Sequence, residues 1–370
     1  MTSVYISGVG LVSSMGANLG EALRHLYNPP EPEQRSIRGL DFPVPYYAIP
    51  PIASATAISW HERCEALIRQ VAAEAGNISN TGGLYLASSS LNVGAMEAGE
   101  NHAKSLPDFL TQLGKMLDWQ GPVVWINTAC TSGLNAILAA EMAIQSGFIQ
   151  DALIIGLELE NNLTLAGFAG MQLLSPDKAR PFATRRSGLV LGEAVAAIAL
   201  SKQPSQWRIA GGAQVVDSSQ VSGASTTAYQ AMLQLTLARA KIMAGQIGLI
   251  KVQAAGSVPN DAVEAAALCN FFSRVPPLLS LKTFLGHTLG ASGAAELALL
   301  LAILEQQQWP NIQLDVDTLD VSLGVNFAAE LPQQLQHILV SNLGFGGSHT
   351  CIALEHTAAD TCSRSQGRRA

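Results

Sequence analysis

The chain has 370 residues, a formal net charge of −7, and 13% charged residues against 48% hydrophobic ones. An acidic chain without runs of Lys or Arg lacks the basic surface that nucleic acids and anionic membranes bind, so neither is expected as the main partner. Its longest apolar runs, such as 194–200, are too short to cross a membrane, and no signal-peptide pattern precedes the first strand-like run, which favours a cytoplasmic protein.

The low charge content also predicts that part of the surface is buried against another subunit. The five cysteines are scattered and form no C-x-x-C pair, which disfavours both a disulfide framework and a zinc site. They are Cys64, Cys130, Cys269, Cys351 and Cys362. We expect no metal and no cofactor.

The first part of the chain alternates strand-like and helix-like segments. Strands are predicted over 4–9 and 83–88, and helices over 18–26 and 59–75. Glycines follow the first strand, but Ser13 stands where a dinucleotide fingerprint needs its third glycine, so no such site is predicted. Residues 28–51 hold many of the prolines and are predicted to form a long loop. Residues 92–117 are predicted to be mostly helical, with a break at Pro107.

The stretch 125–158 has the pattern of a strand, a tight turn, a long Ala/Leu-rich helix and a second strand. Cys130 lies at the turn, where unpaired backbone N–H groups and the positive end of the helix dipole favour a thiolate. We therefore predict that Cys130 is a candidate nucleophile. The alternative is a small core residue, because free cysteines are among the most buried residue types.

Residues 161–177 are predicted to be rich in loops. The densest positive cluster of the chain follows at Arg180, Arg185 and Arg186, either as a solvated face or as a contact for an acidic partner. Further strands are predicted over 189–200, 208–216 and 247–252, and helices over 226–243 and 262–272. Asn260-Asp261 has the side chains of a helix N-cap and stands directly before the last of these helices.

The pattern of strand, turn and helix then recurs. Residues 278–281 lead into KTFLGHTLGASGAAE and a helix of small residues that ends near 305. His287 occupies in this unit the place that Cys130 holds in the earlier one. The chain is therefore predicted to be a duplicated α/β module.

A glycine-dense turn, NLGFGGSH, joins a predicted strand over 337–341 to a returning strand over 351–354. Glycines at this density indicate a backbone that approaches another group closely or adopts positive φ. From 357 on, the sequence is polar and aperiodic, which is typical of a disordered tail.

Together these motifs resemble the β-ketoacyl-ACP synthases, the condensing enzymes of fatty acid and polyketide synthesis, over nearly the whole chain. The matching segments are TACTSGLNA, PFATRRSGLVLGEA, KTFLGHTLGASGAAE and NLGFGG. The resemblance implies the thiolase fold, with two similar α/β halves in α-β-α-β-α layers. It places these halves at 1–201 and 202–356, before the tail at 357–370, and it implies a dimer.

The resemblance also implies a reaction. Cys130 would accept an acyl chain as a thioester from the phosphopantetheine arm of an acyl carrier protein (ACP), with thiolate character supplied by the helix N-terminus and the nearby imidazole. His287 would stabilise the enolate oxygen that forms when malonyl-ACP loses its carboxylate. Lys282 resembles the lysine that the family places near this histidine, with Glu264 as a possible counter-charge.

The glycine-rich turn has an implied role as well. Backbone N–H groups of Cys130 and Phe345 would hold the thioester oxyanion. Phe345 would also be the gate residue, flanked by Gly344 and Gly346 in the substrate-binding loop.

The chain departs from the family motif at the loop before Asn260. Gln253 stands where the family has the first histidine of H-G-T-G-T, and an amide cannot become cationic. Ala255 replaces the threonine that would bind the pantetheine arm, whereas Ser257 keeps the second hydroxyl. His349 follows the glycine-rich turn where Asn is common, and a structural histidine is the expected interpretation.

Three functions are compatible with this pattern. The first is a ketosynthase-like subunit of a type II system, such as an aryl polyene system, that pairs with a complete ketosynthase as chain-length factors do. The second is a homodimeric condensing enzyme that uses Cys130, His287 and Gln253. The third is a non-catalytic scaffold that binds the acyl carrier protein.

Overall fold

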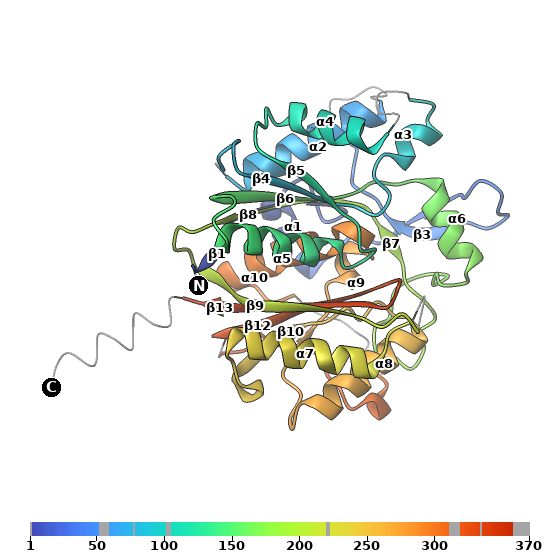
Figure 1. Cartoon of the computed structure of the whole chain (residues 1–370). Coiled ribbons are helices and arrows are strands. Elements are labelled where there is room, and N and C mark those ends of the chain that lie inside the picture. Colours follow the sequence, from blue (N-terminus) through green and yellow to red (C-terminus); the bar gives the residue numbers. More distant parts are fainter. Residues whose placement is uncertain are drawn as a thin grey trace.

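The computed structural model describes residues 2–51, 59–76, 78–100, 105–219, 223–310, 319–333 and 335–357. The predicted tail therefore lies, apart from Thr357, outside the described residues, as does Cys362. No helix in this described part is long and apolar enough to cross a membrane. Figure 1 shows the chain as stacked layers of helices and strands.

Two copies of one five-stranded arrangement form a continuous 10-stranded sheet of order β11-β10-β12-β13-β9-β1-β8-β6-β4-β5. The first copy contains β1 (Val4–Ser13), β4 (Gly83–Ala87), β5 (Val123–Ile126), β6 (Asp151–Glu158) and β8 (Ala194–Ser201). The second copy contains β9 (Trp207–Val216), β10 (Ile247–Lys251), β11 (Leu278–Leu279), β12 (His337–Gly344) and β13 (Ser348–His356). The first strand of each copy, β1 and β9, joins the two through antiparallel pairing.

The strand directions are the same in both copies. In the first, β4 is parallel to β5 and β6, while β8 is antiparallel to β6 and β1. In the second, β10 is parallel to β11 and β12, while β13 is antiparallel to β12 and β9. The predicted duplication is therefore confirmed in topology and strand direction. The boundary expected between 201 and 202 falls in the connection from β8 to β9.

The two five-stranded halves of this sheet stack as two layers, which we call the two sheets. Helices lie between these sheets, outside them and at their ends (Figure 1). They are α1 (Leu19–Arg24), α2 (Trp60–Glu74), α3 (Val93–Glu97), α4 (Leu106–Met116), α5 (Ser132–Gln145), α6 (Asn162–Gly170), α7 (Thr226–Ala240), α8 (Val258–Phe271), α9 (Lys282–Leu285) and α10 (Ser292–Glu305). Short 3-10 turns lie at η1 (His25–Tyr27), η2 (Ala244–Gln246), η3 (Leu289–Ala291) and η5 (Val321–Leu323). With α2 and α4 outside one sheet, α7 and α8 outside the other and α5 and α10 between them, the layers are α-β-α-β-α.

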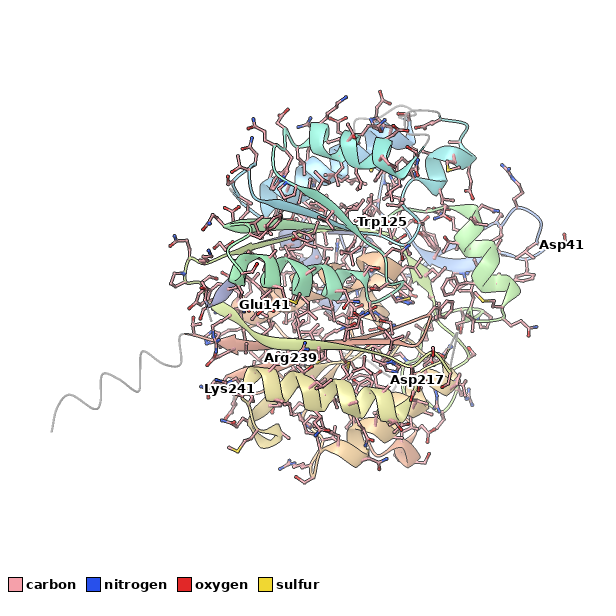
Figure 2. All side chains as sticks on the ribbon, viewed as in Figure 1. Asp41, Trp125, Glu141, Asp217, Arg239 and Lys241 are labelled. Atoms are coloured by element: carbon pink, nitrogen blue, oxygen red, sulfur yellow. The ribbon has the colours of Figure 1, made fainter. Side chains whose placement is uncertain are left out.

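The central layer is the most buried part of the molecule. Every residue of α10 from Ser292 to Leu304 is buried, because its surface is apolar nearly all round and both sheets cover it. Side chains fill the space between the layers, as Figure 2 shows, with Glu141 labelled on α5 and Arg239 on α7.

A pair of glycines lets α5 and α10 approach each other closely. A Cβ on Gly133 would lie 2.6 Å from the backbone nitrogen of Ala294, and one on Gly293 would lie 2.5 Å from that of Leu134. These distances are too short for any side chain, so the backbones themselves are in contact. The contact brings the N-terminal turns of the two helices together, and these turns follow Cys130 and His287.

Two loop predictions were wrong. Within 28–51, β2 (Glu33–Arg35) and β3 (Val44–Tyr47) form a three-stranded sheet with β7 (Leu191–Gly192). This pairing is distant in sequence, so local periodicity could not indicate it. Within 161–177, the chain forms α6, capped by the Asn161 side chain, which accepts a hydrogen bond from the Thr164 N–H.

Candidate active site

Cys130 and His287 lie in equivalent connections of the two halves. Cys130 is in the turn between β5 and α5, after Ala129, whose φ is 53°. His287 lies between α9 and α10. The Cys130 Sγ is 3.1 Å from the His287 Nε2, and the His287 Nδ1 is 3.1 Å from the Ser292 Oγ. The structure therefore brings the two candidate residues into direct contact.

A small cavity opens beside this pair. Its volume is about 30 Å³. Its lining includes Cys130, Phe168, Gln253, Ala255, Ser257, Asp261, Glu264, His287, Leu343, Gly344, Phe345 and His349. Of the residues predicted for the site, Lys282 and Gly346 are not part of this lining.

Phe345 lines the cavity beside an aromatic side chain of α6. Its ring stacks on Phe168 with the ring centroids 5.4 Å apart and an angle of 12° between the planes. The two stacked rings therefore form part of the cavity wall.

Burial controls the ionisation of the pair. Only 5% of Cys130 and 3% of His287 is exposed. Burial raises the pKa of the Cys130 thiol to about 12, although the Lys282 charge opposes this. Burial, with the charges of Lys282 and Lys251, lowers the pKa of His287 well below its usual value. Desolvation therefore opposes the predicted thiolate and acts against the favourable helix N-terminus.

Two backbone N–H groups nevertheless favour negative charge at this point. The N–H groups of Phe345 and of Cys130 itself both lower the pKa of the Cys130 thiol by hydrogen bonding. Gly344 allows this approach, since a Cβ there would lie 3.2 Å from the Cys130 nitrogen. The pair of donors that we expected for an oxyanion is thus present next to the sulfur.

The counter-charge of Lys282 differs from the prediction. Lys282 forms an ion pair with Glu296 of α10, and Lys251 at the end of β10 pairs with the same carboxylate at 2.8 Å. At most 1% of each of these three side chains is exposed. The prediction of Glu264 was wrong because α10, packed between the sheets, delivers Glu296 to both lysines.

Glu264 and Asp261 instead hold the loop that follows β10. The Glu264 carboxylate accepts hydrogen bonds from the Gln253 and Ala254 N–H groups at 2.9 and 2.8 Å, and from the Tyr229 hydroxyl at 3.0 Å. Burial raises the pKa of Glu264. The loop carrying Gln253 and Ala255 is therefore fixed by buried carboxylates.

Asp261 is not the N-cap that was predicted. α8 begins at Val258, with Ser257 in the N-cap position, so Asp261 lies inside the helix. Its carboxylate accepts hydrogen bonds from the N–H groups of Phe182, Ala255 and Gly256. Burial raises the pKa of Asp261 to about 7.

His349 lines the cavity but has a backbone partner at each ring nitrogen. Its Nδ1 is 2.8 Å from the Gly347 carbonyl oxygen, and its Nε2 accepts a hydrogen bond from the Ser225 N–H at 3.0 Å. This geometry requires a neutral ring with the proton on Nδ1. This arrangement agrees with the expectation that His349 has a structural role.

The arginine cluster divides into paired and exposed members. Arg180 pairs with Asp177 at 2.5 Å, and Arg186 pairs with Asp320 at 3.0 Å. Arg185 is exposed. Among the described residues, no group of three or more His, Cys, Asp or Glu side chains is placed to hold a metal ion.

Sequence reasoning gave no role to Lys251, Glu296 or Asn342, although Glu296 and Asn342 lie within the matching segments. A charged residue inside an otherwise apolar helix was the available signal for Glu296. Lys251 ends an apolar strand in the same way. Nothing in the local pattern indicated Asn342, which lies in β12 next to Lys251 of β10 only through strand pairing.

Two family models match the chain in the expected order. "Beta-ketoacyl synthase, N-terminal domain" covers residues 110–206, and "Beta-ketoacyl synthase, C-terminal domain" covers residues 209–314. A "putative polyketide beta-ketoacyl synthase 1" of Streptomyces cyaneus is 28% identical over 64% of this chain, and the match spans 61% of that relative's length. A "3-oxoacyl-[acyl-carrier-protein] synthase 2" of Vibrio harveyi is 27% identical over 66% of this chain and 65% of its own.

A solved structure of the ketosynthase ApeO in complex with its chain length factor ApeC, from Xenorhabdus doucetiae, has the same fold. Its TM-score is 0.84 at 21% identity, with 96% of this chain and 98% of that chain covered. This similarity confirms the predicted thiolase fold.

Proposed function

The chain belongs to the β-ketoacyl synthase family, and we propose that it is an acyl-accepting subunit of a type II fatty acid or polyketide system, such as an aryl polyene system. In this proposal, Cys130 receives an acyl group from an acyl carrier protein, and the subunit pairs with a complete ketosynthase. The observation that carries the proposal is the 3.1 Å contact between the Cys130 Sγ and the His287 Nε2.

This contact supports acyl transfer from a neutral starting pair. The sulfur attacks the thioester carbonyl carbon as Nε2 takes the thiol proton, while Nδ1 stays hydrogen-bonded to Ser292. The carbonyl oxygen becomes an oxyanion, which the N–H groups of Cys130 and Phe345 stabilise. The intermediate then expels the phosphopantetheine sulfur, which takes the proton back from Nε2. The product is an S-acylated Cys130 and a free carrier thiol.

Pairing with a second ketosynthase has separate support. Gln253 and Ala255 remove a cationic donor and a hydroxyl from the family motif, so a complete partner would supply the full set. β5 is an edge strand whose four residues, Val123–Ile126, are all half-buried, and such an edge offers unpaired backbone groups to another chain. A structural neighbour is itself a ketosynthase with its chain length factor.

Intact-mass analysis after mixing with acyl-ACP tests acyl transfer. We expect an adduct of the mass of the acyl group on the native chain and none on Cys130→Ala. A native chain without any adduct would contradict the proposal and leave a non-catalytic scaffold. For the pairing, we expect co-expression with a ketosynthase of the same system to yield a stoichiometric heterodimer.

The second candidate function is a homodimeric condensing enzyme, and the side-chain amide of Gln253 in the cavity lining favours it. An amide N–H can donate a hydrogen bond to an enolate oxygen, although without a full charge. Elongation of acyl-ACP with malonyl-ACP by the purified chain alone would decide for this candidate. An elongated β-ketoacyl product only in the presence of a ketosynthase partner would decide for the paired subunit.

A further inference from the structure

A buried chain of hydrogen bonds leads from Lys251 to the candidate active site. The Lys251 Nζ donates to the Asn342 Oδ1 at 2.9 Å, and the Asn342 Nδ2 donates to the Gln253 Oε1 at 3.2 Å. The Leu343 N–H points at the same Oε1 from 3.4 Å. Lys251 and Asn342 are fully buried, whereas 7% of Gln253 is exposed and it lines the cavity.

These hydrogen bonds determine which way the Gln253 amide faces. Lys251 donates to both of its acceptors, Glu296 and the Asn342 oxygen, so the Asn342 nitrogen must face Gln253. A nitrogen donor at that position requires the oxygen of the Gln253 amide. The Nε2 of Gln253 is then the amide atom left for the cavity, and no described residue accepts a hydrogen bond from it.

We propose that Lys251 is a positioning residue that acts through Asn342 to orient the Gln253 amide and strengthen its Nε2 as a hydrogen-bond donor to a thioester carbonyl oxygen. The inference rests on the proposed function, because it requires a thioester in the cavity, and it adds that this subunit decarboxylates malonyl-ACP itself instead of leaving that step to its partner. Through these hydrogen bonds, the Lys251 charge would replace part of the positive charge that a histidine would carry at position 253.

The local charges support this role. Two ammonium groups, Lys251 and Lys282, share the carboxylate of Glu296, and the Glu264 carboxylate, which also acts on the Lys251 charge, binds the backbone of the Gln253 loop. Hydrogen bonds in a chain polarise one another, and a charged donor at one end strengthens the donor at the other. Burial lowers the pKa of Lys251 to about 8, which still leaves most of it protonated at pH 7.

Decarboxylation of a malonyl thioester is the reaction that would use this donor. The bond between the carboxylate carbon and the α-carbon breaks, carbon dioxide leaves, and the electron pair forms an enolate whose charge lies on the thioester oxygen. The Gln253 Nε2 would donate to that oxygen. Without an acceptor acyl group, the enolate carbon takes a proton from water, and the product is an acetyl thioester.

Asn342→Asp provides the sharpest test because it keeps the shape and the contact with Lys251 but cannot donate to Gln253. The Gln253 amide would then rotate and present its oxygen to the cavity. We expect the release of carbon dioxide from malonyl-ACP to fall by about 10²–10³-fold, as when one oxyanion donor is removed. Gln253→Ala should cause a similar loss, and adding Asn342→Asp to it should change the rate by less than about threefold.

Acylation of Cys130 by acyl-ACP is the parallel readout, and it should persist in Asn342→Asp. Asn18→Asp, the same isosteric change at the N-cap of α1 away from the cavity, is the control and should leave both reactions unchanged. If Asn342→Asp does not fold, Lys251→Met replaces it, with an expected loss of about tenfold in carbon dioxide release.

Other results would overturn the inference. An equal further loss from Asn342→Asp in the Gln253→Ala background would indicate a purely structural role. Acylation of Cys130 without any release of carbon dioxide by the native chain would refute the donor while leaving the proposed function intact. A native chain that is not acylated at all would remove the proposed function, and this inference with it.

Discussion

The reactivity of Cys130 should depend steeply on pH. Burial raises the pKa of its thiol to about 12, so forming the thiolate at pH 7 costs about 7 kcal/mol. Well below the pKa, the thiolate fraction rises tenfold per pH unit. Between pH 6 and pH 10, the rate of alkylation should therefore increase by about 10⁴-fold without a plateau.

Alkylation by iodoacetamide, followed by peptide-resolved mass spectrometry, measures this rate for Cys130 separately from the other cysteines. Circular dichroism at each pH verifies that the fold persists. A plateau beginning below pH 8 would refute the reasoning, because it would mean that the thiolate already exists near neutrality. In that case the helix N-terminus and the backbone N–H groups of Cys130 and Phe345 would outweigh desolvation.

Glu296→Gln should lower the free energy of unfolding by about 3–5 kcal/mol, because two buried ammonium groups lose their carboxylate, and thermal unfolding would reveal this as a lower Tm. Gly293→Ala should lower the free energy of unfolding by about 1–3 kcal/mol, because the new Cβ would lie 2.5 Å from the Leu134 nitrogen and push α5 away from α10. It should also slow the acylation of Cys130. An unchanged Tm would contradict this close contact. Asp261 has a folded-state pKa raised to about 7, so the unfolded chain loses this proton first as pH rises, and the free energy of unfolding should fall by about 3 kcal/mol between pH 4 and pH 7. Urea unfolding should show that this part of the pH dependence disappears in Asp261→Asn.

The sequence alone determined the duplicated architecture and the two residues at its centre. Cys130 directly follows an apolar strand, and His287 follows one after the short helix α9. Each precedes a helix of small residues, and this local pattern encodes both burial and a tight turn. Their equivalent positions in the two halves could be predicted because the same pattern of strand, turn and helix occurs twice. The roles assigned to both residues remain predictions that the acylation experiments test.

The tertiary structure decided the partners and the charge states. Lys282 pairs with Glu296 rather than Glu264 because α10 is packed between the two sheets. Asn342 reaches both Lys251 and Gln253 because β12 pairs with β10. The raised pKa of the Cys130 thiol likewise depends on burial by residues that are distant in sequence. Local sequence patterns determine turns and burial, whereas ion pairs and desolvation depend on segments that meet only in the folded chain.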